Sequence, residues 1–265
     1  MRVIVPIKQV PETNAVRMDE TTGTMVREGV EAIINPLDLY AIETAMRMRD
    51  ACGGEVVTLS MGPAKAERAI REALAMGCDR GVLVSDKVFG GSDTWATSYV
   101  LAAAIRKIGP FDLIICGERA TDGDTGQVGP GIAAFLNLPV ATYIGAVEHV
   151  DAGICRVQRL VEEGHEVLDV LLPAVLTVVK EVGDPRLPTL RGKQRAKKAD
   201  VQTWPLEELD VDAAKVGLKG SPTRVMKIFR PKVARRCVKY TAGDEEAVEA
   251  AVEKLVEFLG QKGLI

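Results

Sequence analysis

The sequence predicts an α/β protein whose core is a parallel β-sheet, and three observations support this fold class. Short apolar runs alternate with longer amphipathic segments over the first half of the chain, as expected of strands joined by right-handed crossover helices. Glycine and proline stand where the hydrophobic period changes. The 265 residues, 47% of them hydrophobic, suffice for one full domain with an appendage.

The expected elements of the first half follow one another with clear boundaries. Asn35-Pro36 opens the first helix because proline suits the first helical position, Gly77 ends the second helix, and Gly109-Pro110 closes the third. In chain order we expect a strand at 3–7, a helix at 36–48, a strand at 56–61, a helix at 64–75, a strand at 81–84, a helix at 93–107 and a strand at 113–116.

The pattern changes after Pro139. Short alternating runs flank Glu163-Gly164 and predict an antiparallel hairpin that is added to the sheet. Residues 174–179 are the last expected strand, and the run from Gly183 to Pro188 ends the globular pattern. The sequence therefore predicts an α/β domain over residues 1–185 and a second region over residues 186–265.

The second region is expected to be an extended arm that ends in a helix. Residues 191–236 are basic in places and poor in periodicity, so they would not fold alone. Apolar residues such as Trp204 and Phe229 favour an arm laid across another subunit over a solvated tail. Residues 244–259 predict an amphipathic helix whose apolar face needs a surface to pack on.

Composition and charge argue against several classes of function. A net charge of −3, from 34 basic and 37 acidic residues, provides no field for nucleic acid. The five cysteines lack a C-x-x-C pair, which favours a reducing cytoplasm, and no apolar run is long enough for a membrane span. His149 and His165 stand apart from any metal-ligand cluster, and no nucleophile motif is present. We therefore expect neither a metal nor a catalytic residue, and a cofactor must supply the chemistry.

The most informative stretch runs from Asp112 to Leu136, where an apolar strand breaks into a glycine-rich loop before a helix begins. Such a loop lies at the carboxyl end of a parallel strand, and the free amides of the following helix favour an anion, so we expect a nucleotide there. The loop matches neither a P-loop nor the G-x-G-x-x-G spacing. Asp122 and Asp124 would repel a phosphate, so they are expected to accept from ribose hydroxyls, hold loop amides or cap the helix, while backbone amides and Thr125 meet the phosphates. A helix cap without any ligand is the alternative interpretation.

Six parts of the chain carry a family resemblance. They are VIVPIKQV at 3–10, NPLD at 35–38, REALAMGCDRG at 71–81, the central loop, the hairpin residues Val157, Arg159, Glu162, Gly164, Glu166 and Leu168, and LPAVLT at 172–177. Together they resemble the beta subunit of electron-transfer flavoproteins, over essentially the whole chain. Glu163 departs from the family pattern, which usually has Gly or Asp there, and this alters only a turn. The resemblance implies a Rossmann-like parallel sheet of the adenine-nucleotide-binding type with helices on both faces, and a heterodimer with a larger alpha subunit that carries an electron-transferring FAD.

The resemblance also implies a nucleotide site at strand ends and helix starts. Ordinary members bind AMP there, whereas the segment from Asp122 to Pro130 looks like the electron-bifurcating branch, in which a second FAD replaces AMP. Gly123 and Gly126 leave room for this larger ligand. Carried over by position, the site residues are Pro6, Asn35, Pro36, Leu37, Asp38, Met61, Gly117, Glu118, Arg119, Ala120, Thr121, Asp122, Gly123, Asp124, Thr125, Gly126, Gln127 and Val128.

Two further segments resemble functional parts of the family. From Phe89 to Thr97 the chain is similar to bifurcating members, and Ser92, Thr94 and Thr97 offer hydroxyls at a helix start that suit a pyrophosphate. A plain capped helix is the alternative there. The recognition loop of the family falls on residues 186–191, where we expect Leu190 to anchor a dehydrogenase.

The function that the resemblance implies is a beta subunit that binds FAD, accepts hydride from NADH and bifurcates the electrons. One electron goes to ferredoxin or flavodoxin, and the other goes through the alpha-subunit FAD to an acyl-CoA or hydroxy-acid dehydrogenase. An ordinary carrier that binds structural AMP is one alternative. A different class is an ATP pyrophosphatase or adenylating enzyme, because Gly90-Gly91-Ser92-Asp93 resembles its phosphate loop, although here it follows an inner strand.

Overall fold

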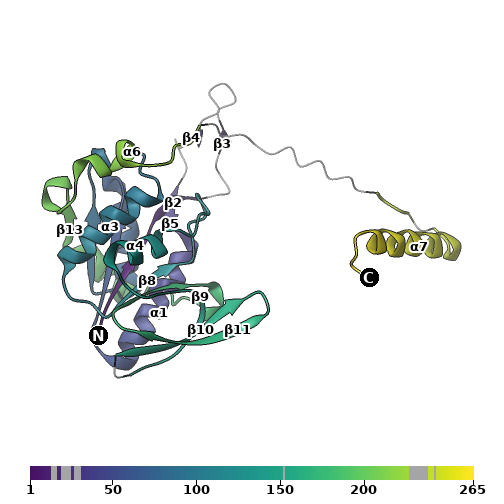
Figure 1. The fold of residues 1–265 in the computed structure, drawn as a ribbon, viewed down its shortest axis with the longest axis horizontal. Coiled ribbons are helices and arrows are strands. Elements are labelled where there is room, and N and C mark those ends of the chain that lie inside the picture. Colours follow the sequence, from purple (N-terminus) through teal and green to yellow (C-terminus); the bar gives the residue numbers. More distant parts are fainter. Residues whose placement is uncertain (13–16, 19–24, 27–30, 152, 227–237, 242) are drawn as a thin grey trace. The chain divides into compact units, whose positions relative to one another are not determined.

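Figure 1 shows the computed structural model, which describes residues 1–12, 17–18, 25–26, 31–151, 153–226, 238–241 and 243–265. The chain forms two compact units, Met1–Lys227 and Ile228–Ile265. The boundary predicted at residue 185 differs from this division. The reason is that a strand and a helix beyond residue 185 pack on the sheet and helices of the first unit.

A nine-stranded sheet forms the centre of the first unit, in the order β11-β10-β9-β12-β8-β1-β6-β7-β13. From β9 to β13 all neighbours pair in parallel, while β9, β10 and β11 pair antiparallel, which confirms the expected fold class and hairpin. In chain order the strands are β1 (Arg2–Pro6), β6 (Glu55–Met61), β7 (Arg80–Val84), β8 (Leu113–Gly117), β9 (Val140–Asp151), β10 (Ile154–Val161), β11 (Gly164–Leu171), β12 (Ala174–Val178) and β13 (Val201–Trp204).

Helices cover both faces of this sheet. Val3 and Val5 of β1 pack with α1 and α2, whereas Ile4 between them packs with α3 and α4, and all three side chains are fully buried. Strands of a parallel sheet are buried on both faces, which explains their continuous apolar runs. The helices are α1 (Pro36–Cys52), α2 (Glu67–Met76), α3 (Thr94–Ile108), α4 (Val128–Leu136), α5 (Leu190–Lys198) and α6 (Gly217–Gly220).

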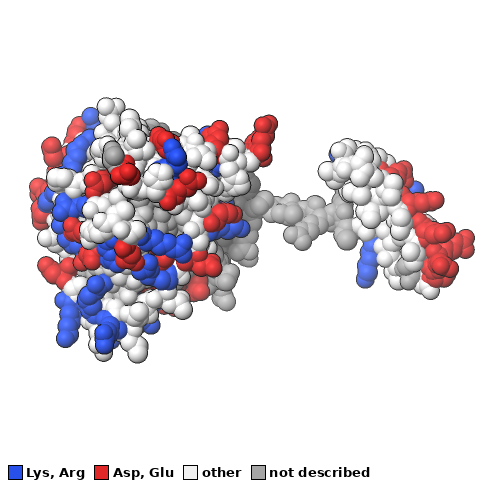
Figure 2. Space-filling model, turned by 90° about the horizontal axis from the view of Figure 1, so that it is seen from below, with Lys and Arg blue, Asp and Glu red and all other residues white. Residues whose placement is uncertain are grey.

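Short elements complete the first unit. β2 (Gln9–Pro11) pairs antiparallel with β5 (Ala32–Ile34), and β3 (Arg17–Met18) pairs antiparallel with β4 (Met25–Val26). The single-turn 3-10 helices are η2 (Ala64–Ala66), η3 (Lys87–Phe89), η4 (Lys180–Val182), η5 (Leu206–Glu208) and η6 (Ala213–Lys215). On the face seen in Figure 2, acidic and basic side chains of this unit are interspersed.

The expectation that residues 174–179 form the last strand is wrong. β13 follows it and pairs with β7 at the edge of the sheet, and Trp204 of β13 is only 7% exposed. Residues 190–198, expected within an irregular arm, form α5 on the surface of α2. Neither element has a clear periodic signal, because β13 is four residues long and Ala196 is the buried residue of α5. Residues 227–236 of the expected arm lie outside the described residues.

In the described part of the second unit, residues 238–241 and 243–265, one helix is present, α7 (Glu245–Gln261), close to the expected range of 244–259. Asp244 begins it, because its Oδ1 accepts from the Ala247 N–H at 2.9 Å. The acidic side chains gather on one side of this helix (Figure 2), and the side chains of Val248, Val252, Leu255, Val256 and Phe258 are about half exposed. Among the described residues, no helix is both long enough and apolar enough to cross a membrane.

Candidate functional site

The strand order reverses between β1 and β8. From β1 the chain continues to β6 and β7 on one side, whereas β8 and β12 lie on the other side. Helix α1, which follows β1 and its loop, packs on one face of the sheet, and α4, which follows β8, packs on the opposite face. The carboxyl ends of β1 and β8 therefore form the topological switch point, where open α/β sheets bind ligands.

Asn35 joins three segments at this switch point. Its Nδ2 donates to Asp38 Oδ1 at 2.9 Å and to the Arg119 carbonyl at 2.9 Å, and its Oδ1 accepts from the Thr121 N–H at 3.1 Å. Its backbone N–H donates to the Lys8 carbonyl at 2.8 Å. Asn35 is fully buried, and these hydrogen bonds satisfy the polar atoms of its side-chain amide. A satisfied buried network of this kind fixes the relative positions of the segments that it joins.

Asp38 is the buried acid of the same network. Its Oδ2 accepts from the Lys8 N–H at 2.7 Å, while Oδ1 accepts from Asn35. Burial raises the pKa of the Asp38 carboxyl to about 7, against these two hydrogen bonds, which lower it. Gly117 ends β8 so close by that a Cβ there would stand 2.6 Å from Asp38 Oδ1. The absence of a side chain at Gly117 therefore lets α1 approach β8.

The loop between β8 and α4 presents free backbone donors. Asp124 and Gly126 have φ angles of 55° and 63°, so the loop bends through two left-handed residues. Within the part of the chain that the structure describes, the amides of Thr125, Gly126 and Gln127 donate to no protein acceptor. Gln127 precedes α4 and makes no side-chain cap. Helix α4 therefore begins with unpaired N–H groups at the switch point, which is the arrangement that binds an anion.

Two cations pair with the acids of this loop. Lys8 Nζ lies 2.6 Å from Asp122 Oδ1, and Arg119 Nε lies 3.1 Å from Asp124 Oδ1. Neither aspartate caps α4. Because each acid has a cation beside it, the loop repels a phosphate less than the sequence implies. Lys8 was not among the expected site residues, although its place directly after the first expected strand is a signal that could have indicated it.

The start of α3 reaches the same edge of the sheet. Thr94 Oγ1 donates to Gln127 Oε1 at 2.8 Å and so links the two predicted segments. The Ser92 hydroxyl instead donates to a carbonyl of its own turn, and Asp93 caps α3. A carboxylate thus occupies the end of α3 at which a pyrophosphate was expected, which favours the capped-helix interpretation for Ser92. Thr97 is half-buried one turn further along α3.

The remaining predicted site residues divide between two places. Pro6 and Met61 end β1 and β6, and Pro36 and Leu37 begin α1, so all four lie at the carboxyl edge with the loop. Leu190 is the first residue of α5 and belongs to a different surface. The structure thus brings the predicted nucleotide-site residues to one edge of the sheet and keeps the predicted docking residue apart from them.

Comparison with known proteins gives consistent matches. The family described as Electron transfer flavoprotein domain matches residues 22–209. The chain is 45% identical to Electron transfer flavoprotein subunit beta of Thermoanaerobacterium thermosaccharolyticum, over 96% of this chain and 98% of that protein. It is 46% identical to Caffeyl-CoA reductase-Etf complex subunit CarD of Acetobacterium woodii, over 87% of this chain and 88% of that protein. It is 41% identical to Protein FixA of Bradyrhizobium diazoefficiens, over 100% of this chain and 93% of that protein.

Proposed function

The chain belongs to the electron transfer flavoprotein family as a beta subunit, and from that premise we propose that it is the FAD-binding subunit of an electron-bifurcating complex. In this proposal NADH donates the hydride. Ferredoxin or flavodoxin accepts one electron, and a dehydrogenase of the acyl-CoA or hydroxy-acid class accepts the other through the FAD of the alpha subunit.

One observation carries the proposal: the uncapped start of α4 at the switch point. Free amides of Thr125, Gly126 and Gln127 suit a pyrophosphate, and hydroxyl-bearing Thr94 lies beside them through its bond to Gln127. Bound FAD would supply hydride acceptance and single-electron donation there. The residues of the chain would bind the phosphates, pair with ribose hydroxyls and hold the loop in place.

The loop is open to solvent at Gly123, which leaves space for a ligand larger than AMP. A Cβ built on Gly123 meets no atom within 4 Å, so the loop is open on that side. The relative CarD is named as a subunit of a caffeyl-CoA reductase-Etf complex, which supports a comparable complex for this chain. The adenylating alternative gains no support, because the carboxylate of Asp93 fills the α3 start that its phosphate loop would need.

A flavin count on the complex with the alpha subunit tests the proposal. We expect two FAD per heterodimer, one of them reduced directly by NADH. Asp122→Asn and Thr125→Val should deplete the NADH-reducible flavin selectively, because the first removes the negative charge beside Lys8 and the second removes a hydroxyl beside the free amides. Thr203→Val is the matched control, since Thr203 is exposed on β13. One FAD with one AMP, and no reduction by NADH, would reject bifurcation in favour of the ordinary carrier.

The second unit supports the alpha subunit as an obligate partner. Val248, Val252, Leu255 and Val256 of α7 repeat at helical spacing and are 46–55% exposed. An apolar helix face of this kind is a liability in a monomer, so we infer that α7 packs on the alpha subunit. Expressed alone, the chain should aggregate or lose residues beyond 227 to limited proteolysis, and co-expression should protect them. A protease-resistant monomer would contradict this assignment.

Residues 186–191 are proposed to dock the dehydrogenase. Leu187 and Leu190 are 85% and 81% exposed, which suits anchors that bury in a partner's pocket. Leu190→Ala should weaken dehydrogenase binding by about 1–3 kcal/mol without changing flavin content. Leu171→Ala, on an exposed leucine of β11, is the control. If the Leu190→Ala variant binds the dehydrogenase as tightly as wild type does, Leu190 is not the anchor.

A further inference from the structure

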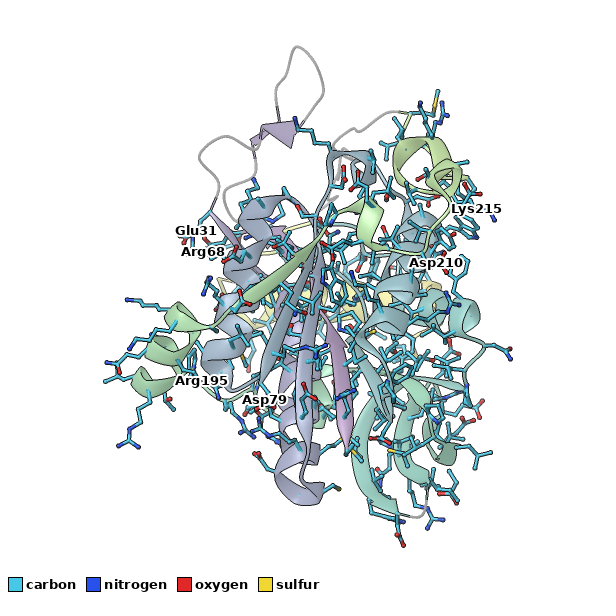
Figure 3. All side chains as sticks on the ribbon, turned by 90° about the vertical axis from the view of Figure 1, so that its left-hand side faces the viewer. Glu31, Arg68, Asp79, Arg195, Asp210 and Lys215 are labelled. Carbon is cyan, nitrogen blue, oxygen red and sulfur yellow. The ribbon has the colours of Figure 1, made fainter. Side chains whose placement is uncertain are left out.

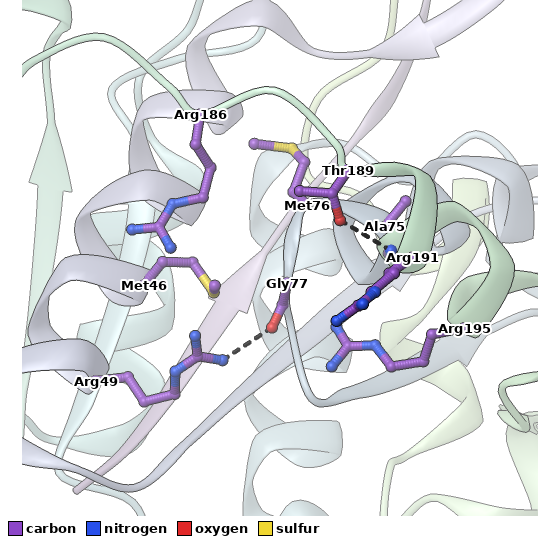
Figure 4. A pocket seen from close by; sticks show the side chains of 10 residues that line it. Met46, Arg49, Ala75, Met76, Gly77, Arg186, Thr189, Arg191 and Arg195 are labelled. Carbon is purple, nitrogen blue, oxygen red and sulfur yellow. Dashed lines mark hydrogen bonds between the residues drawn. The ribbon is translucent and has the colours of Figure 1, made fainter.

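A hollow of about 330 Å³ lies between α1, α2 and the segment that leads into α5, and four guanidinium groups line it. Figure 4 shows Arg49 and Arg186 on one side of Gly77, and Arg191 and Arg195 of α5 on the other side. Helix α2 ends here and β7 begins shortly afterwards, so the hollow lies toward the amino ends of the strands. Figure 3 shows Arg195 at the same end of the sheet as Asp79, which precedes β7.

Arg49 and Arg186 are already paired with acids. Arg49 donates to Asp50 at 2.9 Å and to Asp79 at 3.1 Å. Arg186 donates to Glu43 at 2.8 Å and to Asp50 at 3.0 Å. Glu43 also pairs with Arg47, so three carboxylates balance three guanidinium groups here, and this side of the hollow has a structural explanation.

The α5 side of the hollow has no such balance. Arg195 donates to the carbonyls of Leu74 and Cys78, at 2.9 and 3.0 Å, and these carry no full charge. Among the described residues no acid pairs with Arg195 or with the exposed Arg191. Helix α5, with the sequence LRGKQRAKK, contains five cations and no acid. The α5 side therefore has positive charge that the first unit leaves unneutralised.

The backbone holds these two arginines in place. Thr189 Oγ1 accepts from the Gly192 N–H at 2.9 Å and caps α5. A Cβ on Gly192 would stand 2.1 Å from the Ala75 carbonyl oxygen, so α5 lies directly against the end of α2. Arg191 follows Leu190 immediately, so an exposed apolar anchor and an unpaired guanidinium are neighbours in the chain.

We propose that this hollow binds an acidic side chain of the dehydrogenase that docks at Leu190, with Arg191 and Arg195 as its cationic partners. The inference rests on the docking role proposed above and adds the chemistry of the partner: a carboxylate beside the pocket that takes Leu190. Guanidinium groups bind carboxylates through paired hydrogen bonds, and Met46 and Met76 add an apolar part to the lining of the hollow. Electrostatic pairing of this kind speeds association and makes it depend on salt.

The test compares two charge-removing variants on the same helix. Arg191→Gln removes a cation that lines the hollow, and Lys193→Gln removes an exposed cation of α5 that does not line it. Both are made in the heterodimer, and the probe is an acyl-CoA dehydrogenase that the wild-type heterodimer reduces. The dissociation constant is measured by surface plasmon resonance at several sodium chloride concentrations.

We expect Arg191→Gln to raise the dissociation constant about 5- to 20-fold and to flatten its salt dependence, with Lys193→Gln changing it less than about 2-fold. Equal effects of the two variants would overturn the proposal. Leu190→Ala separates the two assignments: if it weakens binding while Arg191→Gln does not, the hollow alone is rejected, and if it has no effect, the docking role is rejected. Calorimetry with inorganic phosphate provides a second arm. If Arg191→Gln abolishes phosphate binding but leaves the affinity for the dehydrogenase unchanged, the hollow binds a free anion and the proposal is rejected.

Discussion

Helix α1 carries two buried carboxyl groups whose surroundings differ, Asp38 at the carboxyl edge of the sheet and Glu43 beside the arginine-lined hollow. Asp38 accepts from an amide side chain and a backbone N–H, and burial raises its pKa to about 7. Burial alone would also raise the pKa of Glu43, but hydrogen bonds from Arg186 and Arg47 lower it. Helix α1 therefore contributes Asp38, which neutral donors mainly hold, at the carboxyl edge of the sheet. It also contributes Glu43, which is ion-paired, beside the hollow.

The difference indicates how each region keeps its shape. Neutral hydrogen bonds in a buried network depend little on ionic strength, whereas partly exposed ion pairs weaken in salt. A site for a small ligand gains from the first arrangement, because its geometry stays fixed. The ion pairs of Glu43 hold the framework of the hollow, while the unpaired cations of α5 beside it remain free to steer a charged partner.

The largest expected effect comes from breaking the buried network. Asn35→Ala should lower the free energy of unfolding by about 3–5 kcal/mol, because the buried Asp38 carboxyl loses a donor and the part-buried Thr121 N–H and Arg119 carbonyl lose their partner. It should also reduce nucleotide content. Urea denaturation of the complex measures the first effect, with Gln202→Ala at an exposed position of β13 as the control. A loss below about 1 kcal/mol would show that the network does not hold this edge.

The raised pKa of Asp38 predicts a pH dependence. Between pH 4 and about 7 the folded protein binds a proton that the unfolded chain has released, so wild type loses stability as the pH rises through this window. Relative to Asp38→Asn, the loss should reach at most about 4 kcal/mol. Denaturation of both proteins at pH 5 and pH 8 measures the difference. If that difference is the same at both pH values, the carboxyl is not perturbed.

Glu43 should show the opposite sign. Its lowered pKa means that its stabilising contribution is present above the ordinary glutamate range and is lost as the pH falls through the folded-state pKa. Glu43→Gln should therefore cost about 1–3 kcal/mol at pH 7 and progressively less in acid. Thermal denaturation at pH 7 and pH 4 tests this. A cost that grows in acid would contradict the assignment.

The smallest effect on stability is expected for Lys8→Met, which removes the pair with Asp122. An exposed pair of this kind is worth less than about 1 kcal/mol, so the melting temperature should change little. Nucleotide content should nevertheless fall, because Asp122 then stands unpaired beside the proposed anion site. If Lys8→Met lowers the stability but keeps the nucleotide, the Lys8–Asp122 pair stabilises the fold and does not support nucleotide binding.

Much of the fold was predictable from the sequence because its signals are local. The strands at 3–7, 56–61, 81–84 and 113–116 appeared as apolar runs that the structure confirms, and the helices between them had proline or glycine at their ends. Parallel pairing then placed the 117–128 loop at the carboxyl edge without any further information. Each of these inferences uses residues that are close together in the chain.

Only the tertiary structure decided the contacts between distant segments. Lys8 and Asp122 are 114 positions apart, and Asn35 reaches the Arg119 carbonyl across 84, so no periodicity could predict either pair. The pairing of β13 with β7 likewise depends on β7 being the strand at that edge of the sheet. The packing of α5 against α2 depends on contacts between residues far apart in the chain. The sequence by itself determined the elements and the edge at which a ligand was expected, because both follow from local pattern and from the rules of parallel sheets. The partners of the buried acids and the arginine-lined hollow arose only from packing, because they join side chains that the order of the strands brings together.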